Sequence, residues 1–203
     1  MTKIKFCGMR RAEDIVAANA LGADFIGFVF APGSRRAVTP EQAAALKKQL
    51  APGIRAVGVF VNAPPADVAA LLAAGIIDIA QLHGRENAAY LQTLRALTDK
   101  PILKAFRVAA AADLARAATC PADGLLLDSG AGGTGTAFDW TLLQNFPRPY
   151  FLAGGLDPEN VAAAIQTYHP YAVDVSSGIE TNGQKDTTKM AAFAAAVRKE
   201  AQP

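Results

Sequence analysis

The chain has 203 residues, of which 51% are hydrophobic and 19% are charged, and its formal net charge is +2. This length is enough to bury a large core and favours one domain over residues 1–203 rather than two. The nearly balanced charge gives no reason to expect nucleic acid or a membrane as a partner, so any positive potential must be local.

The two cysteines, Cys7 and Cys120, are far apart and lack C-x-x-C spacing. A domain of this size needs no disulfide, so a reduced, cytoplasmic setting is the simplest interpretation. The first residues lack the apolar run of a signal peptide, and no segment approaches the roughly 18 apolar residues of a membrane span.

Apolar, β-rich segments alternate with alanine-rich helical segments along the whole chain, which gives eight β/α units. The predicted strands cover residues 4–7, 24–30, 55–61, 77–82, 102–106, 124–128, 150–153 and 172–176. The predicted helices cover residues 12–21, 40–50, 65–74, 87–97, 109–117, 139–144, 158–168 and 186–200.

Helix boundaries agree with this alternation. Thr39 and Asp157 each precede a proline, as an N-cap precedes a proline at the first helical position. Gly22 and Gly75 stand where a helix ends in a left-handed residue.

The strands themselves, such as A-V-G-V-F-V, are nearly continuous in apolar residues, as a parallel sheet buried on both faces requires. The pattern predicts a (β/α)8 TIM barrel. A doubly wound open sheet is the alternative, but the G-x-G-x-x-G motif expected after its first strand is absent.

The first predicted strand ends at Cys7, and Gly8 allows a sharp turn directly after it. In a barrel, the loops that follow the C-terminal ends of the strands form the active face. Cys7 is therefore a candidate nucleophile or base, and a packed thiol is the alternative.

Asp128 ends the L-L-L-D strand at the same rim, where a carboxyl group and a thiol suit paired acid and base catalysis. Alternatively, Asp128 caps the amides of residues 129–133.

Two late segments suit phosphate binding, L-A-G-G-L-D-P-E-N after the seventh strand and D-V-S-S-G-I-E after the eighth. Glycines let backbone N–H groups approach an anion, and barrels commonly hold phosphate between these two loops. The predicted phosphate-binding residues are Gly154, Gly155, Ser177 and Gly178. The glycines alone are equally consistent with tight turns.

A third cluster has glycine at four of the six positions 130–135 and is flexible enough for a closing lid. The alternative is a mobile loop without ligand contact.

Four polar side chains at other strand ends are further candidates. Arg35 and Arg36 follow the second strand, and one of them is suited to hold a substrate carboxylate in a bidentate fork. Gln81 and His83 share one side of the Q-L-H-G strand. His83 is a candidate donor to a sugar hydroxyl or to the substrate ring, and a structural histidine is the alternative. No spacing indicates a metal site, because His169 falls at the far end of a helix.

These motifs, in this order and spacing, are together similar to phosphoribosylanthranilate isomerase of tryptophan biosynthesis. The resemblance covers residues 3–180 and rests on K-F-C-G-M-R, S-R-R, Q-L-H-G, L-L-L-D-S, G-G-T-G-T-A-F-D-W, L-A-G-G-L and V-D-V-S-S-G-I-E. Seven ordered motifs are specific, although each one alone is weak.

The resemblance implies that Cys7 is the general base and Asp128 the general acid. It implies that Arg36 holds the anthranilate carboxylate and that Asp174 supports the sugar or its loop. The loops around Gly154 and Gly155 and around Ser176, Ser177 and Gly178 would hold the phosphate. Thr136 stands where family members often carry a longer polar residue.

The implied reaction is an Amadori rearrangement of N-(5-phosphoribosyl)anthranilate that needs no cofactor and no metal. We expect a small sugar phosphate as the only class of ligand and a monomer or homodimer as the assembly. An aspartate free in water titrates near ~3.9 and a thiol near ~8.5. At neutral pH the aspartate would therefore be ionised and the thiol protonated, whereas the reaction needs a protonated acid and an ionised base. We hypothesise that Lys5, one inward step below Cys7, favours the thiolate.

Other functions fit the residues less well. An aminoaldose isomerase of histidine biosynthesis shares the phosphate loops, but that family carries an aspartate where Cys7 stands. A sugar-phosphate epimerase would need metal-ligand histidines and paired aspartates. A phosphate-binding module without catalysis would not need both Cys7 and Asp128.

Overall fold

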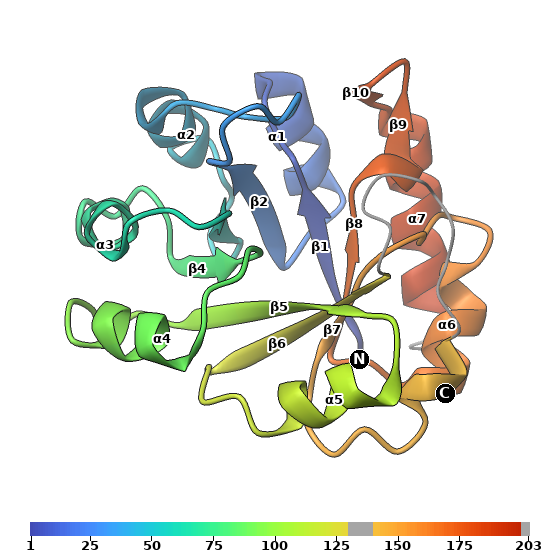
Figure 1. Ribbon diagram of the computed structural model, residues 1–203. Helices are drawn as coiled ribbons and strands as arrows, with labels where there is room; N and C mark the ends of the chain where they lie inside the picture. Colours follow the sequence, from blue (N-terminus) through green and yellow to red (C-terminus); the bar gives the residue numbers. More distant parts are fainter. Residues whose placement is uncertain (130–139, 200–203) are drawn as a thin grey trace.

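A computed structural model describes residues 1–129 and 140–199 of the chain and shows a closed barrel of eight parallel strands with helices outside it (Figure 1). The strands follow one another around the barrel in chain order, and β1 closes the ring against β8. The predicted (β/α)8 barrel is therefore confirmed.

The barrel strands are β1 (Lys3–Cys7), β2 (Phe25–Val29), β3 (Arg55–Phe60), β4 (Ile79–Leu82), β5 (Ile102–Val108), β6 (Gly124–Ser129), β7 (Phe151–Leu152) and β8 (Ala172–Val175). The α-helices are α1 (Ala12–Ala20), α2 (Pro40–Lys47), α3 (Pro65–Ala73), α4 (Ala88–Arg95), α5 (Ala111–Ala118), α6 (Val161–Tyr168) and α7 (Thr187–Lys199). Two short 3-10 helices are η1 (Trp140–Leu143) and η2 (Ser177–Ile179), and a two-stranded hairpin is formed by β9 (Glu180–Thr181) and β10 (Gln184–Lys185).

The helical segment predicted over residues 139–144 is described from residue 140 on, where it forms the 3-10 helix η1 and then a turn at Gln144. The helix predicted from residue 158 begins only at Val161, because Asp157 closes a turn before it. Its Oδ1 accepts hydrogen bonds from the backbone N–H groups of Glu159 and Asn160. The prediction at Thr39 holds, since its hydroxyl caps α2 by accepting from Gln42 N at 3.2 Å.

Side chains alternate between the inside of the barrel and the helices outside it. One apolar layer fills the inside toward the N-terminal ends of the strands, formed by Phe25, Val57, Ile79, Leu103, Ala105, Leu126, Phe151, Ala153 and Ala172. Polar side chains replace this layer toward the C-terminal ends, where Lys5, Gln81 and Asp174 are all buried. The fold thus concentrates its buried polarity under one mouth of the barrel.

The predicted closing segment at residues 130–135, and Thr136 after it, lie outside the described residues. Within the described residues, no helix has the length and apolar character needed to cross a membrane.

Candidate active site

A cavity of about 480 Å³ opens at the C-terminal ends of the strands and is lined by most of the predicted site residues. These are Cys7, Arg36, Gln81, His83, Asp128, Gly154, Gly155, Asp174, Ser176 and Ser177. A second, mainly apolar cavity of about 350 Å³ lies at the opposite end, lined by residues such as Phe25 and Tyr171. It contains none of the predicted site residues, so the first cavity is the candidate active site.

Cys7 ends β1 beneath this cavity and is 8% exposed. It stands in register with Gly27 of β2, and a Cβ atom on Gly27 would come within 2.7 Å of the Cys7 sulfur. Burial raises the pKa of the Cys7 thiol, and the positive charges of Lys5 and Lys185 oppose this increase. The site therefore holds a thiol whose ionisation depends on nearby cations.

Lys5 lies inside the barrel, as hypothesised, and is fully buried. Its Nζ donates to Asp174 Oδ1 at 2.8 Å across the β1–β8 register, which pairs the two residues. Burial opposes the charge on Lys5, but the partners Asp174 and Cys7 outweigh it, and the pKa of Lys5 is raised. Lys5 therefore stays cationic below the thiol, while Asp174 is engaged by Lys5 rather than free in the cavity.

This arrangement predicts the pH dependence of a Lys5→Met variant. In an acid–base pair whose base has the higher pKa, the pH–rate profile falls on its basic side at the pKa of that base. Removal of the Lys5 charge raises the Cys7 pKa, so we expect the basic limb of kcat/KM to move up by roughly one to two pH units.

The control is Lys3→Met, which removes a cation from the other end of the same strand and leaves the limb in place. Because Lys5→Met leaves Asp174 buried without its partner, at a cost of about 3–5 kcal/mol, the profile is also measured in Lys5→Met/Asp174→Asn. A basic limb that stays at the wild-type pH in the single variant contradicts the role of Lys5.

Asp128, near the end of β6, forms a polar chain with two residues of β4 and its loop. Asp128 Oδ2 lies 3.1 Å from His83 Nε2, and His83 Nδ1 lies 3.0 Å from Gln81 Nε2. If the Gln81 amide donates to Nδ1, the other ring nitrogen of a neutral imidazole carries the hydrogen and donates to Asp128. These two hydrogen bonds therefore orient the Asp128 carboxyl group toward the cavity that Cys7 also lines.

The loop that carries His83 is held from behind by a buried ion pair that the sequence did not reveal. Lys104 Nζ donates to Glu86 Oε2 at 2.8 Å and to the carbonyls of Leu82 and Gly84. Glu86 in turn accepts from the backbone N–H groups of Gly84 and Asn62. In the β5 sequence I-L-K-A-F, alternation predicts an apolar side chain that points outward at Lys104. The lysine at this position is the only sign in the sequence of the buried ion pair.

The two predicted phosphate loops lie against each other. Gly154 and Gly155 both have positive φ angles, and within the described residues their backbone N–H groups have no hydrogen-bond acceptor. Gly178 approaches the β7 loop so closely that a Cβ atom there would lie 2.0 Å from the Leu156 carbonyl oxygen. Gly178 thus joins the loops, whereas Ser177 lines the cavity.

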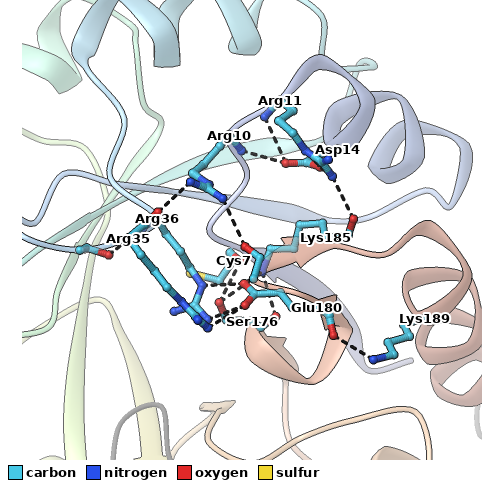
Figure 2. Close-up of polar contacts among 12 residues, drawn as sticks. Cys7, Arg10, Arg11, Asp14, Arg35, Arg36, Ser176, Glu180, Lys185 and Lys189 are labelled. Atoms are coloured by element: carbon cyan, nitrogen blue, oxygen red, sulfur yellow. Dashed lines mark hydrogen bonds and ion pairs between the residues drawn. The ribbon is translucent and has the colours of Figure 1, made fainter.

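Ser176 follows β8, and its hydroxyl already has partners. Its Oγ donates to the Cys7 carbonyl oxygen at 3.1 Å, and Lys185 Nζ donates to the Ser176 carbonyl oxygen at 2.8 Å (Figure 2). Ser176 therefore joins the β8 loop to the end of β1, next to the position predicted for the phosphate.

Arg36 is the inward member of the arginine pair, with an 18% exposed side chain against 62% for Arg35. Both side chains bind Glu180 at the start of the β9–β10 hairpin, and so does Lys185 (Figure 2). The sequence predicted no role for Glu180 or Lys185, although Glu180 ends the V-D-V-S-S-G-I-E motif.

Within residues 1–129 and 140–199, no group of three histidine, cysteine, aspartate or glutamate side chains is placed to hold a metal ion. The cavity is lined by groups able to transfer protons, among them the Cys7 thiol, the Asp128 carboxyl group and the His83 ring. A (β/α)8 barrel with these groups beside two glycine loops and an arginine defines an acid–base enzyme for a small anionic substrate.

A model of the family described as N-(5'phosphoribosyl)anthranilate (PRA) isomerase matches residues 4–196. The chain belongs to this family, and it is an isomerase of tryptophan biosynthesis. Its relatives include the N-(5'-phosphoribosyl)anthranilate isomerase of Magnetococcus marinus, which is 48% identical over 97% of this chain and 95% of the relative.

Solved structures agree with this assignment. The phosphoribosyl anthranilate isomerase of Thermotoga maritima is 35% identical, covers 98% of this chain and 100% of its own, and has a TM-score of 0.90. The enzyme from that organism is also described as dimeric. Another phosphoribosyl anthranilate isomerase, 34% identical with a TM-score of 0.88 over 98% of this chain and 100% of its own, was solved in complex with reduced 1-(o-carboxyphenylamino)-1-deoxyribulose 5-phosphate.

Proposed function

We propose that the cavity converts N-(5-phosphoribosyl)anthranilate into 1-(2-carboxyphenylamino)-1-deoxyribulose 5-phosphate, with Asp128 as general acid and Cys7 as general base. The observation that carries this proposal is that the thiol and the carboxyl group line one cavity, together with the two glycine loops and Arg36. Proton transfer by two positioned side chains is sufficient for the reaction, and no redox cofactor is involved.

In the first step, protonated Asp128 gives its proton to the ring oxygen of the ribose. The bond between this oxygen and C1 then breaks, and the lone pair of the anthranilate nitrogen forms the C1=N bond of a Schiff base. The contact between His83 and Asp128 supports this role, because it fixes the direction of the carboxyl group.

In the second step, the Cys7 thiolate removes the proton from C2 of the sugar. The electrons of that C–H bond form a C1=C2 double bond, and the electrons of the C=N bond return to nitrogen. The enolamine product then moves its hydroxyl proton to solvent and gains a proton at C1, which yields the ketone. The protonated imine is the electron sink.

Three groups are proposed to hold the substrate. The phosphate is assigned to the loops of Gly154, Gly155, Ser176, Ser177 and Gly178, where an anion can approach the backbone N–H groups of the first loop without a Cβ in the way. The anthranilate carboxylate is assigned to Arg36.

The sugar is assigned to Gln81, His83 and Asp174. Gln81 Oε1 is buried and has no hydrogen-bond partner among the described residues. A buried acceptor without a donor is costly, and a ribose hydroxyl would satisfy it.

The substrate assignment is tested by offering the purified enzyme two aminoaldoses, N-(5-phosphoribosyl)anthranilate and the bis-phosphorylated substrate of histidine biosynthesis. We expect conversion of the first, followed by the change in anthranilate fluorescence, because Arg36 suits a carboxylate and Cys7 stands where the histidine enzymes carry aspartate.

A Cys7→Ser/Asp128→Asn double variant, purified in the same way, is the control. Any conversion in this preparation comes from contaminating enzymes of the expression host. Turnover of the histidine substrate without turnover of the anthranilate would contradict the proposal.

The assembly and setting belong to the same proposal. We propose one domain over residues 1–203, a monomer or homodimer in the cytoplasm, and no nucleic-acid or membrane partner. The dimeric enzyme of Thermotoga maritima supports the homodimer. The free thiols of Cys7 and Cys120 support a reducing compartment, since the base must remain unoxidised.

A further inference from the structure

Glu180 is the centre of a charge cluster at the mouth of the barrel, and its side chain is only 5% exposed. Its Oε1 accepts from Arg36 Nε at 2.6 Å and from Lys185 Nζ at 2.8 Å. Its Oε2 accepts from Arg36 Nη2 and from Arg35 Nη2, both at 2.9 Å. Figure 2 shows the three cations converging on this one carboxylate.

The fork between Arg36 and Glu180 leaves part of the guanidinium free. A guanidinium has five N–H groups, and the two bonds to Glu180 use Nε–H and one N–H of Nη2. The Nη1 group and the second N–H of Nη2 remain, and together they can bind a second carboxylate end-on. Within the described residues, no acceptor takes these groups.

The stem of Arg36 is also fixed. It lies over Gly8, where a Cβ atom would come within 2.5 Å of Arg36 Cδ. Glu180 holds the guanidinium group, and the turn after β1 holds the aliphatic part of the side chain. The orientation of the free edge of the guanidinium is therefore fixed. Arg36 lines the cavity in this position.

The cluster remains attractive to an anion although it contains a carboxylate, because three cations surround that one negative charge. Burial alone would raise the pKa of Glu180, but the hydrogen bonds from Arg36 and Lys185 lower it to about 2. Glu180 thus stays ionised at neutral pH and keeps its fork with Arg36 while a second anion binds.

The hairpin also ties this cluster to the base. Lys185 is 6% exposed and joins Glu180 Oε1 to the carbonyl of Ser176, whose hydroxyl donates to the Cys7 carbonyl. Lys189 at the start of α7 donates to the Glu180 carbonyl at 2.8 Å, which holds β9 against the last helix. Lys185 therefore holds the side chain of Glu180, and Lys189 holds its backbone.

We propose that Glu180 is a positioning residue that aims the free edge of Arg36 at the aromatic carboxylate of the substrate, and that it thereby sets the preference for an anthranilate over an uncharged aniline. This inference rests on the proposed function, in which Arg36 binds that carboxylate. It assigns the specificity of the site to the β9–β10 hairpin as well as to the loop of Arg36.

The test compares N-(5-phosphoribosyl)anthranilate with N-(5-phosphoribosyl)aniline, which lacks the carboxylate, and measures kcat/KM for each by chromatography of the products. A charge-assisted hydrogen bond contributes about 1.5–3 kcal/mol, so we expect Glu180→Gln to reduce the preference for the anthranilate by about 10- to 100-fold. The loss appears in KM for the anthranilate, and it exceeds any change in kcat/KM for the aniline.

Glu180→Asp separates geometry from charge, because it keeps the carboxylate but shortens its reach by one methylene group. We expect it to lose the preference as well, and it decides the question if Glu180→Gln does not fold. Glu13→Gln, the same substitution on the exposed face of α1, is the matched control and keeps the wild-type preference.

Removal of a negative charge would by itself favour the anionic substrate. A preference that is unchanged or increased in Glu180→Gln and unchanged in Glu180→Asp would therefore overturn the positioning role. A wild-type enzyme that converts neither compound would instead refute the proposed function, so the two failures are distinguishable.

Discussion

Replacement of Asp128 by asparagine is expected to lower kcat by about 10²- to 10⁴-fold, the usual contribution of a positioned general acid. Asparagine has the same shape and can accept a hydrogen bond from His83, but it has no acidic proton to give to the ribose oxygen. The measurement is kcat at saturating N-(5-phosphoribosyl)anthranilate, followed by fluorescence.

The matched control for this variant is Asp123→Asn. Asp123 precedes the same strand at the opposite end of the barrel, where it accepts from Arg95 and from the backbone N–H of Ile102 at 2.7 Å. We expect this control to keep the wild-type kcat, apart from any loss of stability. An Asp128→Asn enzyme with wild-type kcat would show that another group protonates the sugar.

Cys7→Ser is expected to lower kcat by a similar factor of about 10²–10⁴. Serine fits the same space beside Gly27, but its hydroxyl does not ionise in the range where a thiol does, so it is a poor base at neutral pH. Lys5 and Lys185 cannot compensate, because their charges act only on a group that can ionise.

The control here is the second cysteine of the chain. Cys120 is half-buried beside the outer apolar core and does not line the cavity, so Cys120→Ser should keep the wild-type kcat. Equal losses in the two cysteine variants would point to general destabilisation rather than to a base at Cys7.

The sequence predicted the fold well because the barrel strands carry a strong and repeated signal. Strands such as β3 and β6 are nearly continuous apolar segments, and nothing but a sheet buried on both faces accommodates so many of them. The predicted boundaries differ from the structure at β7, which spans only Phe151–Leu152, and at α6, where Asp157 forms a turn before the helix begins.

The sequence was sufficient to predict those candidate site residues that lie at the C-terminal ends of barrel strands. Cys7, Gln81 and Asp128 follow from alternation, because a side chain that points inward near the C-terminal end of a barrel strand must face the mouth. The same rule placed Lys5 inside the barrel.

Partners that come from distant loops were not predictable in this way. Glu180 and Lys185 lie on a hairpin of two-residue strands, which is too short to produce a periodic pattern. Glu86 and Lys104 meet because β4 and β5 are neighbours, and nothing in either local sequence shows that the two charges pair. Such ion pairs depend on tertiary contacts, which a local pattern does not encode.

The division of labour between Asp128 and Cys7 is the central claim, and a substrate with deuterium at C2 of the ribose tests it most directly. Without its base, the enzyme should be limited by removal of the C2 proton, and without its acid it should be limited by ring opening. We therefore expect a larger isotope effect on kcat in Cys7→Ser than in Asp128→Asn. A larger effect in Asp128→Asn, or no effect in Cys7→Ser, would contradict the assignment.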